Sequence, residues 1–129
     1  TSLMAAAGVG SDAIHMKKSG VFPIVHGVRV LALENGITET STSGRLDELA
    51  SREVLSEEMV SDIRSALSYF MEVRLRSQLT AMRTGRQEEE AIVRLNELSS
   101  RERDLLREAL KVVKRFKEIV RAHYRLAML

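Results

Sequence analysis

The stretch that decides the fold is residues 17–33, which read Lys17-Lys18-Ser19-Gly20-Val21-Phe22-Pro23-Ile24-Val25-His26-Gly27-Val28-Arg29-Val30-Leu31-Ala32-Leu33. Pro23 suits the first turn of a helix, because its fixed φ is helical and the N–H that it lacks would have no partner there. Asn35 and Gly36 together supply a C-terminal stop. The stretch therefore predicts a helix from about Pro23 to Glu34, with a basic lead-in that ends at Gly20.

Apolar residues cover most of this helix at helical spacing, so it should be buried on most sides. Two polar residues interrupt the pattern: His26 and Arg29 lie three positions apart and share a face. Gly27, between them, costs about 1 kcal/mol of helix propensity relative to alanine, which indicates that another backbone or a ligand comes close. Two interpretations stay open. The polar pair either belongs to the bundle core or faces a ligand.

The composition indicates a single soluble globular domain of 129 residues. The chain has 20 basic and 18 acidic residues, a net charge of +2, so no strongly basic face predicts a nucleic-acid partner. The absence of cysteine excludes disulfides, thiolate metal sites and cysteine nucleophiles, and fits a cytoplasmic protein. No apolar run reaches the roughly 18 residues that span a bilayer, so no membrane partner is expected.

Residues 1–16 are expected to be a leader, irregular or derived from cloning, followed by one helical domain at 17–129. The leader lacks the basic start of a signal peptide. Gly10-Ser11 is similar to the Gly-Ser that opens a nucleotidyltransferase active site. However, the metal-binding carboxylates that should follow are replaced by the segment Val21-Phe22-Pro23-Ile24. The chain alone is therefore not expected to be catalytic.

Three more helices are predicted, each from a hydroxyl residue that can cap its start. Thr42 or Ser43 should cap a short helix from Arg45 to about Arg52, and no segment has the period of a strand. The two long helices should run from Ser56 to Thr84-Gly85 and from Ser99 to about Leu126. Four helices without a strand predict an all-α fold, an antiparallel four-helix bundle.

Two arginines on these helices stand out. Arg45 opens the short helix, where a cation is unfavourable for the helix dipole. Arg74 continues the inward face of the long helix, while the apolar stripe drifts sideways through Leu75, Leu79 and Met82. Because an unpaired interior charge is costly, Arg74 should belong either to an internal ion pair or to a ligand site.

Several kinds of site are absent from the sequence. The three histidines, His15, His26 and His123, lack the close spacing with other donors that a metal site needs. The chain has neither a glycine-rich phosphate loop ending in Gly-Lys-Ser/Thr nor a Gly-x-Ser-x-Gly nucleophile elbow. We therefore expect no metal and no cofactor in this chain itself.

The run from Lys17 to Arg29 closely resembles the signature of a known family, the putative nucleotidyltransferase substrate-binding domain. That signature typically reads Leu-Lys-Lys-Gly-Gly-Leu-Phe-Pro-Ile-Val-His-Gly-Val-Arg-Ala-Leu-Ala-Leu. The resemblance continues through Ile37-Thr38, Thr42, Arg45-Leu46, the segment from Arg74 to Leu79, and Leu105 to Phe116. Ser19 replaces a usual glycine, and Gly44 replaces an acid, which puts an ion pair between Arg45 and its immediate neighbour in doubt.

The resemblance implies a bundle similar to the one that follows the catalytic fold in kanamycin nucleotidyltransferase. It also implies a C-terminal position in a bacterial signalling protein. The upstream catalytic domain would resemble those that uridylylate PII proteins, often preceded by cyclic-nucleotide-binding-like and paired CBS domains. The bundle would close over that active site and help to hold nucleotide or acceptor, with Mg²⁺ and a nucleoside triphosphate bound by the parent enzyme.

From this comparison and from the positions of the charges, we expect six substrate-binding residues: Lys17, Lys18, His26, Arg29, Arg45 and Arg74. The two lysines precede the positive end of the first helix, where free N–H groups favour anions. The alternative is a non-catalytic interaction module that dimerises or docks neighbouring domains. Arg29 and Arg74 paired with acids inside the core, and no cleft beside His26, would favour that alternative. A helical RNase is disfavoured, because neither His26 nor His123 has an arginine at the required upstream spacing.

Overall fold

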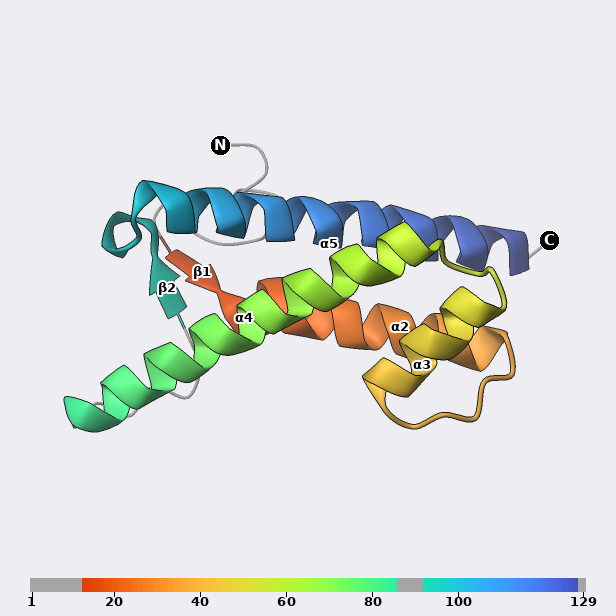
Figure 1. Cartoon of the computed structure of the whole chain (residues 1–129), viewed down its shortest axis with the longest axis horizontal. Helices are drawn as coiled ribbons and strands as arrows, with labels where there is room; N and C mark the ends of the chain where they lie inside the picture. The colour runs from red at the N-terminus through yellow and green to blue at the C-terminus, as the bar shows by residue number, and fades with distance from the viewer. Residues whose placement is uncertain (1–12, 86–91, 128–129) are drawn as a thin grey trace.

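The structure is a computed structural model that describes residues 13–85 and 92–127 of the 129-residue chain. Helices dominate it, which confirms the all-α prediction (Figure 1). The elements are, in order, β1 (Ala13–His15), the π-helix η1 (Lys17–Val21), α2 (Phe22–Glu34), α3 (Thr42–Ser51), α4 (Glu57–Arg83), β2 (Ile92–Arg94), the 3-10 helix η2 (Leu95–Glu97) and α5 (Ser100–Ala127). No helix in the described ranges is both long and apolar enough to cross a membrane.

The two long helices and α2 form the body of the bundle. Figure 1 shows α2 and α5 running in the same direction, while α4 runs back across them in the opposite direction. The short helix α3 packs at the C-terminal end of α2. The core lies between these helices, and its largest fully buried side chains are Phe70 of α4 and Phe116 of α5.

Side-chain caps fix where the two long helices begin. The Ser56 hydroxyl accepts a 3.0 Å hydrogen bond from the Met59 N–H at the start of α4. Before α5, the Ser99 hydroxyl accepts from the Glu102 N–H at 3.2 Å, and the Glu102 carboxylate accepts from the Ser99 N–H at 3.5 Å. These reciprocal bonds form a capping box, and both predicted helix starts are confirmed.

The predicted start of α3 was wrong by three residues. The helix begins at Thr42, and its N-cap is Ser41, whose hydroxyl accepts a 2.9 Å hydrogen bond from the Gly44 N–H. Thr42 and Ser43, the expected caps, lie inside the first turn. Several hydroxyl residues in a row can each cap a helix, so composition alone does not choose among them.

The expectation that residues 1–16 form an irregular leader was wrong for the part that the structure describes, residues 13–16. Residues 1–12 lie outside the described residues, but β1 pairs antiparallel with β2, placing Ile14 opposite Val93. Ile14 and Met16 are completely buried in the core. Gly20 does not end a lead-in, because η1 continues without a break into α2. A three-residue strand shows too little of its period for the sequence to reveal it.

Candidate functional site

A groove of about 330 Å³ lies between α2 and α5. Its lining comes from Pro23, His26, Gly27 and Val30 of α2, and from Phe116, Lys117, Val120, Arg121 and Tyr124 of α5. The groove thus has an apolar floor, two aromatic side groups and two cations. It includes one of the six residues expected from the sequence, His26.

Gly27 explains how the two helices approach closely beneath this groove. A Cβ added to Gly27 would lie 2.6 Å from Phe116 Cε2 and 3.2 Å from Val120 Cγ2. Real Cβ atoms essentially never come so close to a ring carbon, so only glycine fits without a shift. The sequence predicted that another backbone or a ligand comes close at Gly27; what lies there is the side-chain ring of Phe116 on the neighbouring helix α5.

His26 lies at the edge of the groove rather than in the core. Its ring stacks on Phe22, with centroids 6.1 Å apart and planes inclined by 19°. Phe22 is itself 60% exposed, and His26 is exposed as well. The stacked pair therefore presents a flat aromatic surface to solvent beside the groove.

Two cations and a phenol on α5 form the other edge. Lys117 and Arg121 are exposed and lie four residues apart, so they share one face of α5. Neither forms an ion pair with another described residue. Tyr124, three residues after Arg121, is 53% exposed. An apolar floor edged by aromatic rings and uncompensated positive charge is suited to a planar ring that carries anionic groups.

The other five expected residues lie outside this groove. Arg29 is exposed on α2, one turn after His26. Arg45, at the start of α3, donates from Nε to the carbonyl oxygen of Glu39 at 2.9 Å. Lys17 and Lys18 are exposed on η1. The candidates therefore come from four elements: η1, α2, α3 and α4.

The physical reason given for the two lysines does not hold. The expectation was that free N–H groups at the start of α2 would attract an anion. Instead, the Phe22 N–H donates to the carbonyl oxygen of Lys17, because η1 precedes α2 without interruption. The helix dipole at Pro23 is thus not open to a ligand in the expected way.

Arg74 is half-buried on α4 and lines a separate hollow. Its Nε atom is buried and has no hydrogen-bond partner. Neither Arg74 nor Arg29 forms an ion pair within the described ranges. A pure interaction module would have been favoured by Arg29 and Arg74 paired with acids in the core and by the lack of a cleft beside His26. The described residues show neither of these two features.

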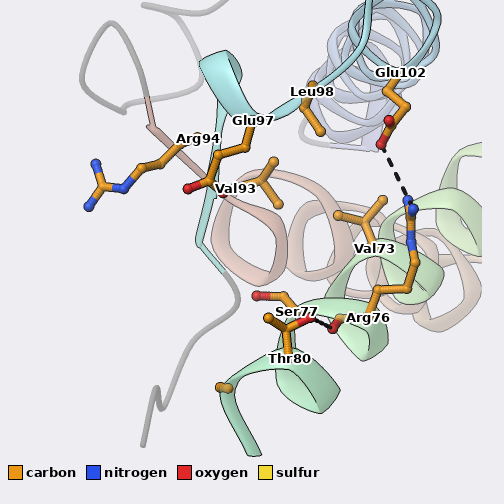
Figure 2. A pocket seen from close by; sticks show the side chains of 10 residues that line it. Val73, Arg76, Ser77, Thr80, Val93, Arg94, Glu97, Leu98 and Glu102 are labelled. Atoms are coloured by element: carbon orange, nitrogen blue, oxygen red, sulfur yellow. Dashed lines mark hydrogen bonds and ion pairs between the residues drawn. The ribbon is translucent and has the colours of Figure 1, made fainter. Parts of the chain in front are cut away.

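A second hollow, of about 370 Å³, was missed from the sequence (Figure 2). It lies between the C-terminal half of α4, the β2–η2 segment and the first turn of α5, and polar groups of Arg76, Ser77, Thr80, Glu97 and Glu102 line it. Its charges are partly compensated, because Arg76 lies 3.8 Å from the Glu102 carboxylate. Figure 2 shows the Arg94 side chain directed away from that pair. The hollow is therefore less suited to a polyanion than the α2–α5 groove.

The residues that sequence reasoning missed have one cause in common. Lys117, Arg121 and Tyr124 sit on α5, where alternation of charge and apolar residues reads as an ordinary solvated face. Their role at a groove depends on Gly27, ninety or more positions earlier in the chain, because the glycine brings α2 against α5. Gly27 was a signal that the sequence contained, but the sequence did not indicate which helix packs against it.

The comparisons with known proteins agree with the resemblance seen in the sequence. The family described as "Putative nucleotidyltransferase substrate binding domain" matches residues 3–124, which is nearly the whole chain. No curated protein and no solved structure matches the chain. The match includes the signature from Lys17 to Arg29 and all of the residues that line the α2–α5 groove. This chain is a member of the putative nucleotidyltransferase substrate-binding domain family.

Proposed function

We propose that this domain holds the nucleotide substrate of a nucleotidyltransferase in the groove between α2 and α5. The observation that carries the proposal is the pair of uncompensated cations, Lys117 and Arg121, beside an apolar floor at Gly27. A nucleoside triphosphate has both a planar base and a polyanionic tail. The groove offers a complementary surface to each part.

The base would lie over the floor at the half-buried side chains of Val30 and Val120, with the rings of His26 and Tyr124 at its edges. Stacking on aromatic side chains stabilises a base without requiring hydrogen bonds to its edge. The phosphates would extend toward Lys117 and Arg121. A guanidinium can donate two parallel hydrogen bonds to one phosphate, which makes Arg121 the stronger of the two contacts.

The catalytic step would belong to an upstream nucleotidyltransferase domain of the same polypeptide, similar to uridylyltransferases, which would supply Mg²⁺. The present domain would act as the accessory surface that closes over that active site. Arg29, exposed on α2 one turn from His26, would supply a further cation outside the groove. Lys17, Lys18, Arg45 and Arg74 lie on other elements and would face an acidic acceptor.

The test is a titration of the domain with UTP and with ATP, followed by NMR and calorimetry. Groove resonances, those of Gly27 and His26 first, should shift on addition of nucleotide. The double variant Lys117→Ala, Arg121→Ala should weaken binding at least about tenfold, which corresponds to about 1.4 kcal/mol.

A matched control is the double variant Lys111→Ala, Lys114→Ala. It removes the same charge from the same helix, outside the groove. Lys111 forms only an exposed ion pair with Glu108, so its loss should affect folding little. Equal weakening by the two double variants would show unspecific attraction of anions and would overturn the proposal. Failure of nucleotide to shift the groove resonances would overturn it as well.

A further inference from the structure

The C-terminal half of α4 is apolar on two opposite faces. Phe70, Val73 and Ala81 point into the bundle and are buried. The other face carries four large apolar side chains with exposed fractions of 54, 55, 43 and 76%: Met71, Leu75, Leu79 and Met82. The sequence-based view that the core stripe drifts sideways here was wrong, since the core face continues straight and a second stripe lies behind it. A helix face that carries several large exposed apolar side chains is typical of an interaction surface.

The exposed stripe follows the heptad rule of paired helices. Met71, Leu75, Gln78 and Met82 are separated by four, three and four residues, the alternation of the a and d positions. Leu79 flanks this seam. Only one of the four seam positions is polar, and a single polar residue at such a position typically fixes register and partner number.

The stripe also contains a hollow. Its volume is about 510 Å³, and it is lined by Met71, Glu72, Arg74, Leu75 and Gln78. Four of these residues stand at positions i, i+3, i+4 and i+7. On one face of a helix, these positions form the four-residue hole that accepts a knob from a facing helix.

We propose that this stripe pairs antiparallel with the same stripe on a second copy of the chain, about a two-fold axis. The inference goes beyond the proposed nucleotide site, because none of the residues that line the α2–α5 groove is on α4. In the antiparallel register, Met71 of each copy faces Met82 of the other. Leu79 of each copy then lies over the hole at Leu75 of the other.

Charge complementarity selects a second copy in this orientation. Glu72 lies at one end of the stripe and Arg83 at the other, on the same flank of α4, and both are exposed. Neither forms an ion pair with another described residue. Antiparallel pairing brings each Glu72 beside Arg83 of the other copy, and the two-fold axis makes this contact twice. In a parallel pair the Glu72 and Arg83 flanks of the two copies would lie on opposite sides of the dimer, so this contact would not form.

The length of the stripe sets the expected strength. From Met71 to Met82 the helix rises about 17 Å, three turns, which is a short contact compared with a standard interface. The dimer should therefore be weak and depend on concentration, with a dissociation constant in the micromolar range. In a longer polypeptide, further contacts would strengthen it by raising the effective concentration.

The experiment is analytical ultracentrifugation of the 129-residue chain from micromolar to near-millimolar concentration. The wild type should pass from monomer to dimer in this range. Leu79→Glu should raise the dissociation constant at least about thirtyfold, because it places a charge opposite an apolar hole. Leu33→Glu is the matched control: Leu33 is 65% exposed on α2, away from the stripe, and its replacement should leave the dimer unchanged. Circular dichroism checks that both variants remain folded.

A charge exchange tests the orientation. Glu72→Arg and Arg83→Glu should each weaken the dimer several-fold, while the double variant Glu72→Arg, Arg83→Glu should restore the wild-type dissociation constant. A chain that stays monomeric at every concentration would overturn the proposal, and the stripe would then serve another part of a longer polypeptide. A dimer that is insensitive to Leu79→Glu would overturn it too. Nucleotide titration of the Leu79→Glu monomer measures the groove separately, so failure of one proposal does not imply failure of the other.

Discussion

Gly27 of α2 and the Phe116 ring of α5 lie so close that a Cβ at position 27 would be 2.6 Å from Phe116 Cε2. Phe116 is completely buried, so a shift of its ring would disturb the side chains packed around it. The floor of the α2–α5 groove therefore depends on the absence of one methyl group.

Gly27→Ala should destabilise the domain even though alanine is the better helix former. Alanine gains about 1 kcal/mol of helix propensity, while the forced shift of a packed core costs about 1–3 kcal/mol. We expect the free energy of unfolding to fall by about 1 kcal/mol, as measured by urea denaturation. Adding Phe116→Leu should make the alanine less harmful than it is in the wild-type background. An alanine variant as stable as the wild type would contradict the close contact.

The sequence identified the elements that have long periodic patterns and caps. The helix that ends at Asn35-Gly36 was predicted to within one residue of α2, and Gly36 has the positive φ of 67° that favours glycine at such a stop. Ser56 and Ser99 were recognised because a hydroxyl followed by acids is a strong local signal. Each of these features depends on residues that are close together in the chain, so it can be recognised in a single sequence.

Features that depend on distant partners could not be predicted in the same way. Ile14 is buried because β1 pairs with β2, which lies almost eighty residues later in the chain. The apolar residues Leu75 and Met82 fit the core as well as they fit an outer stripe, and only the position of the neighbouring helices decides between the two faces. The six expected site residues remain a prediction, since charge and spacing cannot show which side chains meet in space.

Gly20→Ala should destabilise the domain more than Gly27→Ala does. An added Cβ would lie 2.6–2.7 Å from three carbons of the Phe70 ring, and Phe70 is completely buried. The added Cβ would lie almost equally close to Cγ, Cδ1 and Cδ2 of Phe70, so a small rotation of the ring does not relieve the contact. We expect the free energy of unfolding, measured by urea denaturation, to fall by about 3 kcal/mol or more.

Gly85→Ala is a useful comparison for this loss. Nothing lies within 4 Å of a Cβ at Gly85, but its φ of 71° is unfavourable for alanine. This backbone strain alone should cost about 1 kcal/mol. Equal losses at positions 20 and 85 would mean that the Phe70 contact does not limit the packing of η1 on α4.

Ser56→Ala should destabilise the domain through the start of α4. The Ser56 hydroxyl accepts the hydrogen bond of the Met59 N–H, and loss of such a cap typically costs about 1 kcal/mol. Ser65→Ala provides the control, because Ser65 is exposed within the same helix and caps nothing. The control should be neutral or slightly stabilising, since alanine is the better helix former. Unfolding monitored by circular dichroism distinguishes the two, and equal effects would rule out the cap.

Tyr69 should make the stability of the domain sensitive to alkaline pH. Burial raises the pKa of the Tyr69 phenol above its ordinary value of about 10, and the negative charges of Glu102 and Glu72 raise it further, against an opposing effect of Arg76. The Tyr69 hydroxyl also donates to the Glu102 carbonyl oxygen at 3.3 Å. The folded state therefore holds this proton more tightly than the unfolded state does. Its contribution to stability is complete below pH 10 and is lost as the pH rises through the pKa of the folded state.

Tyr69→Phe should consequently flatten the decline in unfolding free energy above pH 10, measured by urea denaturation at a series of alkaline pH values. The pKa itself can be read in a Tyr124→Phe background, because the chain has two tyrosines and Tyr69 is then the only phenol. Phenolate absorbance in that variant should rise at a pH above the ordinary value for tyrosine. Glu102→Gln should bring the titration back toward that value, since glutamine removes the negative charge while it can still serve in the capping box with Ser99. A titration that does not respond to Glu102→Gln would show that the charge of Glu102 does not contribute to this pKa.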